Sequence, residues 1–173
     1  MPMSLSGHEL VSYADEIAST AHLGEEYGGR PFIRHPRAVA KLAEMDGYPP
    51  EVIAACLLHD VPESRGTDGW ELRDEIPSLV VVEAVVAVTS YAGQSETDKI
   101  TRAKSHPVGA VTKAKDSTHN LATTYLNPAR ITEQDRNGAV LKYARYLASL
   151  GIIPTPEEIN IYLELRRDRG DDR

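Results

Sequence analysis

Hydrophobic residues recur every three or four positions along most of the chain, which is the period of an α-helix. The pattern predicts amphipathic helices over 7–23, 37–45, 108–126, 132–150 and 156–166. Residues 51–60 are apolar on almost every side, as is typical of a helix at the centre of a fold. Pro62 disfavours helical geometry at the residue before it, so this central helix should bend or end where His59 and Asp60 emerge.

Four further segments give less regular patterns. Residues 25–36 contain paired glycines and two prolines, which predict a loop. We expect a short helix over 68–76, while 95–105 is polar and fits either a helix or a loop. Residues 79–89 are rich in valine and favour a strand on propensity alone. Because no segment elsewhere shows the alternating pattern of a partner strand, a buried helix is the better prediction.

Length and composition indicate one globular domain. The chain has 173 residues, of which 41% are hydrophobic and 26% charged, and these are ordinary values for a soluble protein. We expect an all-α bundle of about seven to nine helices over residues 1–166 and a charged, flexible tail over 167–173. The net charge of −7 argues against a nucleic-acid or membrane partner, because such partners require a broad basic field.

Redox and targeting signals are few. Cys56 is the only cysteine and lies in the apolar run, so we expect neither an intrachain disulfide nor a thiolate metal cluster. The first residues lack the basic start and long apolar stretch of a secretory signal. The longest apolar stretch, 79–88, is too short to span a bilayer. These features predict a cytoplasmic protein and leave a homo-oligomer open.

The adjacent pair His59-Asp60 is the first candidate for chemistry. Burying an imidazole and a carboxylate is costly unless they are paired, hydrogen-bonded or coordinated. A metal site would explain the pair, and so would a buried ion pair. Further along, Asp116, Asn120 and Thr123 are spaced by four and three residues, which places them on one helix face. That face is either part of a site or an ordinary exposed polar surface.

Four motifs occur in order along the chain. They are Ala21-His22-x-Gly24, Pro31-Phe32-Ile33-x-His35-Pro36, Leu57-Leu58-His59-Asp60-Val61-x-Glu63 and Asp116-x-x-His119-Asn120-Leu121-x-Thr123. Over residues 10–152 the chain resembles the HD-domain hydrolases, and most closely the RelA/SpoT-type hydrolases of ppGpp, including small stand-alone ones. The resemblance implies a single HD-domain helical bundle and a metal-dependent phosphohydrolase. The absence of a synthetase region after these motifs favours a stand-alone hydrolase.

The resemblance implies a metal site and a catalytic group. The implied ligands are His35, His59, Asp60 and Asp116, and the family typically holds Mn²⁺ there. Nitrogen and oxygen ligands without a thiolate suit Mn²⁺ and leave Zn²⁺, Fe²⁺ and Mg²⁺ open. Glu63 matches the catalytic glutamate that orients or deprotonates the attacking water, and Asp60 also belongs to the implied catalytic set.

The resemblance also implies how a phosphorylated nucleotide binds. The implied substrate-binding residues are Tyr27, Arg30, Arg34, Ser64, Asn120 and Thr123, with Asn120 also in the catalytic set and Lys113 and Lys142 as looser candidates. The reaction would remove the 3′-pyrophosphate of ppGpp or pppGpp to give GDP or GTP and pyrophosphate. We expect His119 to support the site or pack beside it, His22 to be structural, and His8 and His106 to have no role.

Three positions depart from the family pattern. Ser64 follows Glu63 where an aspartate is usual, Tyr27 stands near the place of an arginine that packs on guanine, and Ala122 replaces an arginine. Two alternatives therefore stay open. One is an HD phosphohydrolase acting on a nucleoside monophosphate, a deoxynucleoside triphosphate or NADPH. The other is a catalytically impaired regulator that binds an alarmone.

Overall fold

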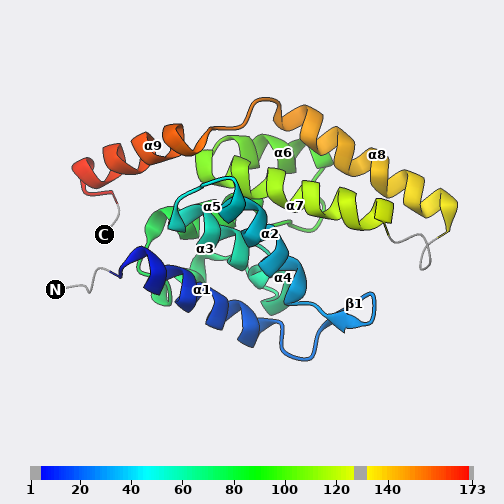
Figure 1. Ribbon diagram of the computed structural model, residues 1–173, viewed down its shortest axis with the longest axis horizontal. Coiled ribbons are helices and arrows are strands. Elements are labelled where there is room, and N and C mark those ends of the chain that lie inside the picture. The colour runs from blue at the N-terminus through cyan, green and yellow to red at the C-terminus, as the bar shows by residue number, and fades with distance from the viewer. Residues whose placement is uncertain (1–4, 127–131, 172–173) are drawn as a thin grey trace.

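The computed structural model describes residues 5–126 and 132–171, and Figure 1 shows its arrangement of helices. In chain order the elements are α1 (Gly7–Ala21), β1 (Glu26–Tyr27), β2 (Arg30–Pro31), α2 (Arg34–Met45), α3 (Pro50–Leu58), α4 (Val61–Arg65), the 3₁₀ helix η1 (Trp70–Asp74), α5 (Leu79–Val88), α6 (Glu96–Lys104), α7 (Pro107–Leu126), α8 (Glu133–Leu150) and α9 (Pro156–Arg169). The predicted all-α bundle is confirmed.

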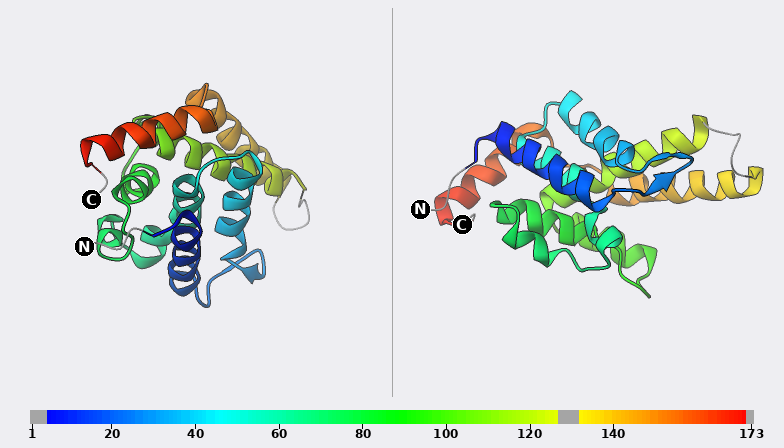
Figure 2. Two further views of the ribbon diagram at one scale, coloured as in Figure 1. Left: turned by 60° about the vertical axis from the view of Figure 1, so that its left-hand side comes forward. Right: turned by 90° about the horizontal axis from the view of Figure 1, so that it is seen from below.

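Helix α3 is the centre of the bundle, as its apolar sequence predicts. It packs against α1, α2, α5 and α7, and two views from other sides show it surrounded (Figure 2). Val52, Ala55 and Leu58 have no solvent exposure. The helix ends at Leu58, and a new short helix, α4, starts at Val61 with Pro62 in its first turn. The predicted break at His59 and Asp60 is therefore confirmed.

Helix α5 confirms the prediction of a buried helix over the valine-rich segment. Val80, Val81, Val82 and Val85 are completely buried among the neighbouring helices. Within the part of the chain that the structure describes, the only strands are β1 and β2, which pair with each other, so no sheet is available to this segment. Burial on all sides here outweighs the intrinsic strand preference of valine.

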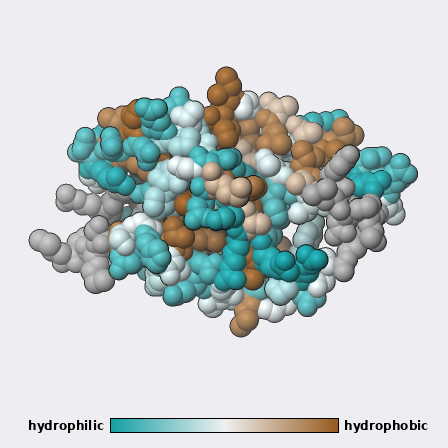
Figure 3. Space-filling model, in the orientation of Figure 1, coloured by the Kyte–Doolittle hydropathy of each residue, from teal (hydrophilic) through white to brown (hydrophobic). Residues whose placement is uncertain are grey.

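A second, smaller core joins α6, α7 and α8. It contains Ile100, Ala103, Ala114, Tyr146 and Leu150. Helix α8 runs back along α7, which Figures 1 and 2 both show. On the face drawn in Figure 3, hydrophobic residues are interspersed with hydrophilic ones. Among the described residues, no helix is both long and apolar enough to cross a membrane.

The segment 25–36 differs from the predicted loop. It contains the antiparallel pair β1–β2, whose two-residue turn is Gly28-Gly29, with φ of 61° and 73°. Two successive positive φ values produce the tight turn that suits a hairpin and are cheap only for glycine. Helix α2 also begins at Arg34, three residues before its predicted start, because Pro36 is tolerated in a first turn.

Helix α1 ends at Ala21 rather than at the predicted Leu23, and the structure settles the type of two further segments. Residues 68–76 contain the 3₁₀ helix η1 rather than an α-helix, and 95–105 contain α6, which Ser95 caps. Helix α9 continues to Arg169 instead of ending at Arg166. Arginines near a helix C-terminus are stabilised by the helix dipole, and Arg167 also donates to Glu51 at 2.7 Å. The first part of the predicted tail is thus helical, and residues 172–173 lie outside the described chain.

Candidate metal centre and substrate pocket

The four predicted ligands meet at one point although they come from three separate parts of the fold. His35 lies in the first turn of α2, His59 and Asp60 lie between α3 and α4, and Asp116 lies in the middle of α7. His35 Nε2 is 3.5 Å from Asp60 Oδ2 and 3.2 Å from Asp116 Oδ1. His59 Nε2 is 3.1 Å and 3.6 Å from the same two oxygens. Two imidazole nitrogens and two carboxylate oxygens therefore face a common centre.

The break between α3 and α4 lets two adjacent residues face this centre. Neighbouring side chains on a regular helix point about 100° apart, so both could not do so from its interior. Here His59 ends α3, and Asp60, with φ −99° and ψ −3°, leads into α4. The sequence signal for this geometry is Pro62, which cannot continue the hydrogen bonding of α3.

The hydrogen bonding of His59 fits a metal ligand. Its Nδ1 donates to the carbonyl of Cys56 at 2.7 Å, which leaves Nε2 as a bare lone pair. Nε2 is buried and hydrogen-bonds to none of the described residues, although Asp60 Oδ2 is only 3.1 Å away. Two acceptors at this distance need a cation or a proton between them. Burial alone would lower the pKa of His59, but the Asp60 and Asp116 carboxylates outweigh it and raise that pKa well above its usual value.

Asp116 is held by partners on both oxygens. Oδ1 accepts from Asn120 Nδ2 at 2.6 Å, and Oδ2 accepts from Lys113 Nζ at 2.9 Å. Burial would raise the pKa of Asp116, but the charge of Lys113 and the adjacent imidazoles of His35 and His59 hold that pKa well below its usual range. Asp116 is thus ionised and fixed in direction. Asn120, predicted to act in catalysis and substrate binding, here orients Asp116 and also lines the pocket.

His119 supports His35 from the opposite side of the ring. The two Nδ1 atoms are 2.9 Å apart, so one nitrogen donates and the other accepts. Burial, and next the charge of His35, lower the pKa of His119, which favours the neutral, accepting form. With His35 donating through Nδ1, its Nε2 is free to coordinate a cation. The predicted supporting role of His119 agrees with this contact.

Glu63 lies one helical turn beyond the ligand pair and lines the same pocket. Its Oε1 accepts from the backbone N–H of Ser90 at 2.8 Å, which fixes the carboxylate at the pocket edge. Partial burial, and next the negative charge of Asp60, raise the pKa of Glu63. A carboxylate with a raised pKa is a better proton acceptor for an attacking water.

The pocket over the ligands has a cavity of about 210 Å³. Its cationic wall is formed by Lys99 of α6, Lys113 of α7 and Lys142 of α8. The Lys142 ammonium lies 5.6 Å from the centroids of both the Tyr143 and Tyr146 rings. Such a wall is suited to phosphate groups.

Another part of the pocket wall is aromatic. It includes Tyr27, at the hairpin turn, and Phe32, whose ring centroids are 6.4 Å apart in an edge-to-face arrangement. Tyr143 lines the pocket as well. Tyr27, predicted from its place in the sequence to contact a base, is thus in the pocket and 62% exposed. An exposed ring at a pocket is able to stack on a nucleotide base.

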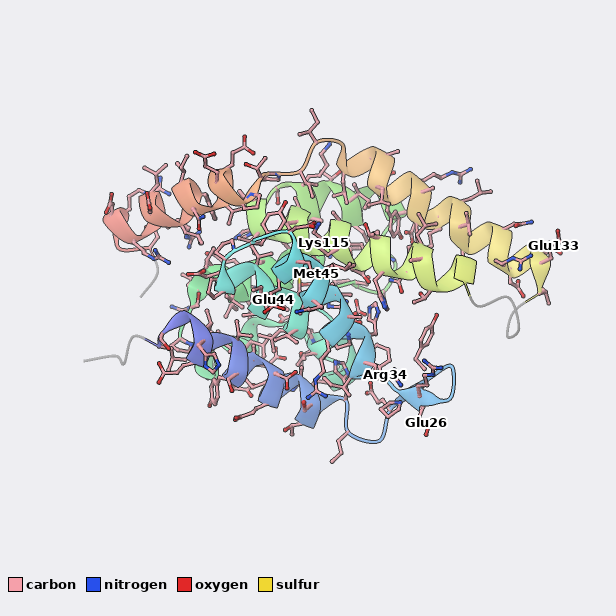
Figure 4. The ribbon with its side chains drawn as sticks, viewed as in Figure 1. Glu26, Arg34, Glu44, Met45, Lys115 and Glu133 are labelled. Atoms are coloured by element: carbon pink, nitrogen blue, oxygen red, sulfur yellow. The ribbon has the colours of Figure 1, made fainter. Side chains whose placement is uncertain are left out.

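Four of the predicted substrate-binding residues are not part of the pocket lining: Arg30, Arg34, Ser64 and Thr123. Arg30 and Arg34 are exposed, and Figure 4 shows Arg34 at the start of α2, beside the hairpin that carries Glu26. The Thr123 hydroxyl donates to the carbonyl of His119 at 2.9 Å, within α7. The Ser64 hydroxyl contacts His22 and Glu25 instead.

Several lining residues were not predicted, namely Phe32, Val88, Ser90, Lys99, Thr112, Tyr143 and Tyr146. Phe32 belongs to the second motif and stands three residues before His35, so its position was the available signal. Lys99 lies in a polar segment without a motif. Its place in the pocket follows from the packing of α6 on α5 and α7, which sequence periodicity does not give.

Comparisons with known proteins bear on the family and the fold of the chain. No protein-family model matches the chain. A protein of Mycobacterium leprae (strain TN) described as "Probable GTP pyrophosphokinase" is 30% identical over 128 residues, which cover 69% of this chain and 16% of that protein. The chain thus spans about a sixth of this relative's length.

A solved structure shares the fold over almost its whole length. It is described as a metazoan ortholog of SpoT that hydrolyses ppGpp and plays a role in starvation responses. The TM-score is 0.69 at 19% sequence identity, and the match covers 97% of this chain and 98% of the other. The chain therefore has the all-helical fold of this SpoT ortholog, and the resemblance of its four motifs to the RelA/SpoT-type hydrolases is confirmed.

Proposed function

We propose that the chain is a metal-dependent phosphohydrolase that removes the 3′-pyrophosphate from ppGpp or pppGpp, giving GDP or GTP and pyrophosphate. The observation that carries the proposal is the meeting of His35, His59, Asp60 and Asp116 beside a pocket that Glu63 and three lysines line. The fold neighbour is described as hydrolysing ppGpp, which supports the same substrate here.

The ligand set fits a divalent cation, with Mn²⁺ as the proposed metal. Three of the ligands, His35, His59 and Asp60, offer atoms that all lie within 4.8 Å of one another. Imidazole and carboxylate ligands suit Mn²⁺ without excluding Zn²⁺, Fe²⁺ or Mg²⁺. When bound, the cation would lower the pKa of a water molecule and offset negative charge on the phosphate.

The chain's own residues supply the remaining parts of the reaction. Glu63, held by Ser90, takes the proton of the attacking water or orients that water. Lys99 and Lys142 pair with phosphate oxygens of the substrate, while Lys113 keeps Asp116 ionised. Asn120 fixes the direction of Asp116. All the residues to which these roles are assigned line the same pocket.

A second substrate class has support from the aromatic wall. Tyr27, Phe32 and Tyr143 offer ring faces, and an aromatic ring stacks on any nucleotide base. The pocket therefore also suits another phosphorylated nucleotide, such as a nucleoside monophosphate, a deoxynucleoside triphosphate or NADPH. A regulator that binds an alarmone without cleaving it has less support, because Glu63 is in place beside the ligands.

A metal-loaded assay against a nucleotide panel tests the proposal. The purified chain with excess Mn²⁺ is given ppGpp, pppGpp, nucleoside monophosphates, deoxynucleoside triphosphates and NADPH, and each product is identified. We expect pyrophosphate release from ppGpp, a loss of about 10²- to 10⁴-fold in Glu63→Gln, and loss of metal binding in Asp60→Ala. Turnover of another nucleotide alone would reassign the substrate. Binding without turnover in every case would leave only the regulator.

The predicted cytoplasmic location and a possible homo-oligomer remain part of this proposal. The single buried cysteine, Cys56, is consistent with a reducing compartment. Fractionation of cells that express the tagged chain tests the location, and light scattering of the purified protein tests the oligomeric state.

A further inference from the structure

Beside the pocket, three polar side chains from separate segments form a closed triangle of contacts. They are His22 at the end of α1, Glu25 before the hairpin and Ser64 on α4. His22 Nδ1 is 3.0 Å from Glu25 Oε2, Ser64 Oγ is 2.9 Å from the same oxygen, and Ser64 Oγ is 2.9 Å from His22 Nδ1. The Glu25 carboxylate thus accepts from both the serine hydroxyl and the imidazole.

Glu25 connects this triangle to the hairpin through its backbone as well. Its N–H donates to the carbonyl of His22 at 3.1 Å, and its carbonyl accepts from the N–H of Phe32 at 2.9 Å. The His22 ring also packs on the Phe32 ring, with centroids 4.7 Å apart. Phe32 in turn lies 5.8 Å from the His35 ring and lines the pocket. Glu25 and His22 therefore fix the position of Phe32 in the aromatic wall.

The other side of the triangle holds the helix that carries Glu63. Helix α4 has only five residues, and Ser64 directly follows Glu63 in it. Side-chain contacts tie this short helix to its surroundings: the Glu63 carboxylate accepts from the Ser90 N–H, Arg65 pairs with Glu75, and the Ser64 hydroxyl donates to Glu25. Of these, only the Ser64 contact links α4 to the segment before the hairpin. A short helix with few bonds of its own depends on such ties for its position.

The chemistry of His22 argues against a packing role alone. Its side chain has no solvent exposure, and its Nε2 hydrogen-bonds to none of the residues that the structure describes. An unpartnered buried polar atom costs free energy, which an apolar residue of similar size would avoid. What the imidazole adds is its Nδ1 contact to Glu25, whose carboxylate also binds the Ser64 hydroxyl.

We propose that His22, Glu25 and Ser64 are positioning residues that fix Glu63 and the Phe32 wall relative to each other across the pocket. This inference rests on the proposed hydrolase function. It extends that function by assigning a role to three residues that do not touch the reacting atoms. The network acts through Glu63, so its loss lowers kcat rather than metal affinity.

A double-mutant cycle tests the network in the full chain. Ser64→Ala and Glu25→Ala are each measured for kcat and KM on ppGpp, for Mn²⁺ affinity and for Tm, beside the double variant. We expect each single variant to lower kcat by about 10-fold or more, with KM and Mn²⁺ affinity within about 3-fold of the wild type. The double variant should fall no further, because residues of one network are not additive. Ser64→Thr, which keeps the hydroxyl, should restore kcat.

Ser19→Ala is the matched control, because Ser19 lies on α1 and its hydroxyl accepts from Arg37 at 3.0 Å, away from the hydrogen bonds that the structure describes for the triangle. It should leave kcat unchanged. A kcat for Ser64→Ala within 2-fold of the wild type, or additive losses in the double variant, would overturn the network.

Amide hydrogen exchange separates failure of the network from failure of the proposed function. The Phe32 N–H, which donates to Glu25, should exchange at least about 5-fold faster in Ser64→Ala than in the wild type and in Ser19→Ala. If the wild type does not hydrolyse ppGpp, the proposed function fails, and the exchange rate of the Phe32 N–H alone then decides whether the three residues form a network. Unchanged protection of Phe32 would then overturn the network, whereas faster exchange would support it.

Discussion

His106 should make the stability of the protein depend steeply on pH, independently of the metal site. It lies just before α7, its side chain is 12% exposed, and its Nδ1 accepts from the N–H of Gly109 at 3.2 Å. Glu83 of α5 is 3.6 Å from its Nε2, and the Tyr162 hydroxyl of α9 is 3.4 Å away. Arg166, also on α9, forms an ion pair with Glu83 at 2.7 Å. The His106 imidazole is therefore largely buried, and the carboxylate beside it, that of Glu83, is already paired with Arg166.

These surroundings lower the pKa of His106 to about 4 from 6.5. Burial is the main cause; the charge of Arg166 also lowers the pKa, while Glu83 partly offsets both. Because the folded protein binds a proton on His106 less readily than the unfolded chain, the neutral form contributes stability above pH 6.5. That stability is lost as the pH falls through 6.5 towards 4.

The two pKa values give the size of the effect. At pH 5 the unfolded chain is stabilised by roughly 2 kcal/mol through protonation of this histidine, and at pH 4 by roughly 3 kcal/mol. Small domains are stable by only about 5–15 kcal/mol in total, so this is a measurable share.

Urea unfolding of the wild type and of His106→Asn at pH 7, 5 and 4 tests the calculation. Asparagine can still accept from the Gly109 N–H but does not titrate. Other titrating groups occur in both proteins and cancel, so the wild type should lose about 2 kcal/mol relative to the variant between pH 7 and 5. A difference that stays within about 0.5 kcal/mol across this range would contradict the lowered pKa of His106 in the folded protein.

Three further predictions concern the centre of the fold and the metal site. Mn²⁺ at about 100 times its Kd should raise the free energy of unfolding by about 2.7 kcal/mol in the wild type and not in Asp60→Asn, as measured by urea unfolding with and without chelator. Cys56 is fully buried and burial raises its pKa to about 12, so a thiol reagent at pH 8 should label it only after unfolding; rapid native labelling would contradict its burial. Leu58→Ala should lower the free energy of unfolding by about 2–5 kcal/mol, because Leu58 is completely buried beside His59; a loss under about 1 kcal/mol would mean that the cavity collapses.

The helices could be predicted from the sequence because their signals are local. Apolar periodicity repeats within one or two turns, so a short stretch of sequence is enough to show it. The missed features depend on less direct signals. Gly28-Gly29 indicated a turn, but two residues on each side were too few to show strand alternation. The predicted start of α2 is three residues late because the paired glycines and two prolines of 25–36 predict a loop, although a first helical turn accepts Pro36.

The predicted metal ligands and the predicted substrate-binding residues differ in how well the sequence places them at the pocket. The reason is the distance along the chain over which each position is determined. His59 and Asp60 owe their direction to a break that Pro62 imposes two residues away, and Asp116 lies at a fixed helical spacing from Asn120. Two of the pocket's cations, Lys99 and Lys142, have no such local cause. Arg30 and Arg34 were expected there from the resemblance, yet the hairpin and the earlier start of α2 leave both exposed.

Lys99 and Lys142 reach the pocket instead, and they do so because α6 and α8 pack against α7. Their positions are therefore set by tertiary contacts such as those of Ile100 and Tyr146 in the smaller core, rather than by the four motifs. It follows that a change in that core can move these two ammonium groups while every motif residue stays in place. Two chains with identical motifs can thus share the metal chemistry and still prefer different nucleotides, and substrate preference should be sought in α6 and α8.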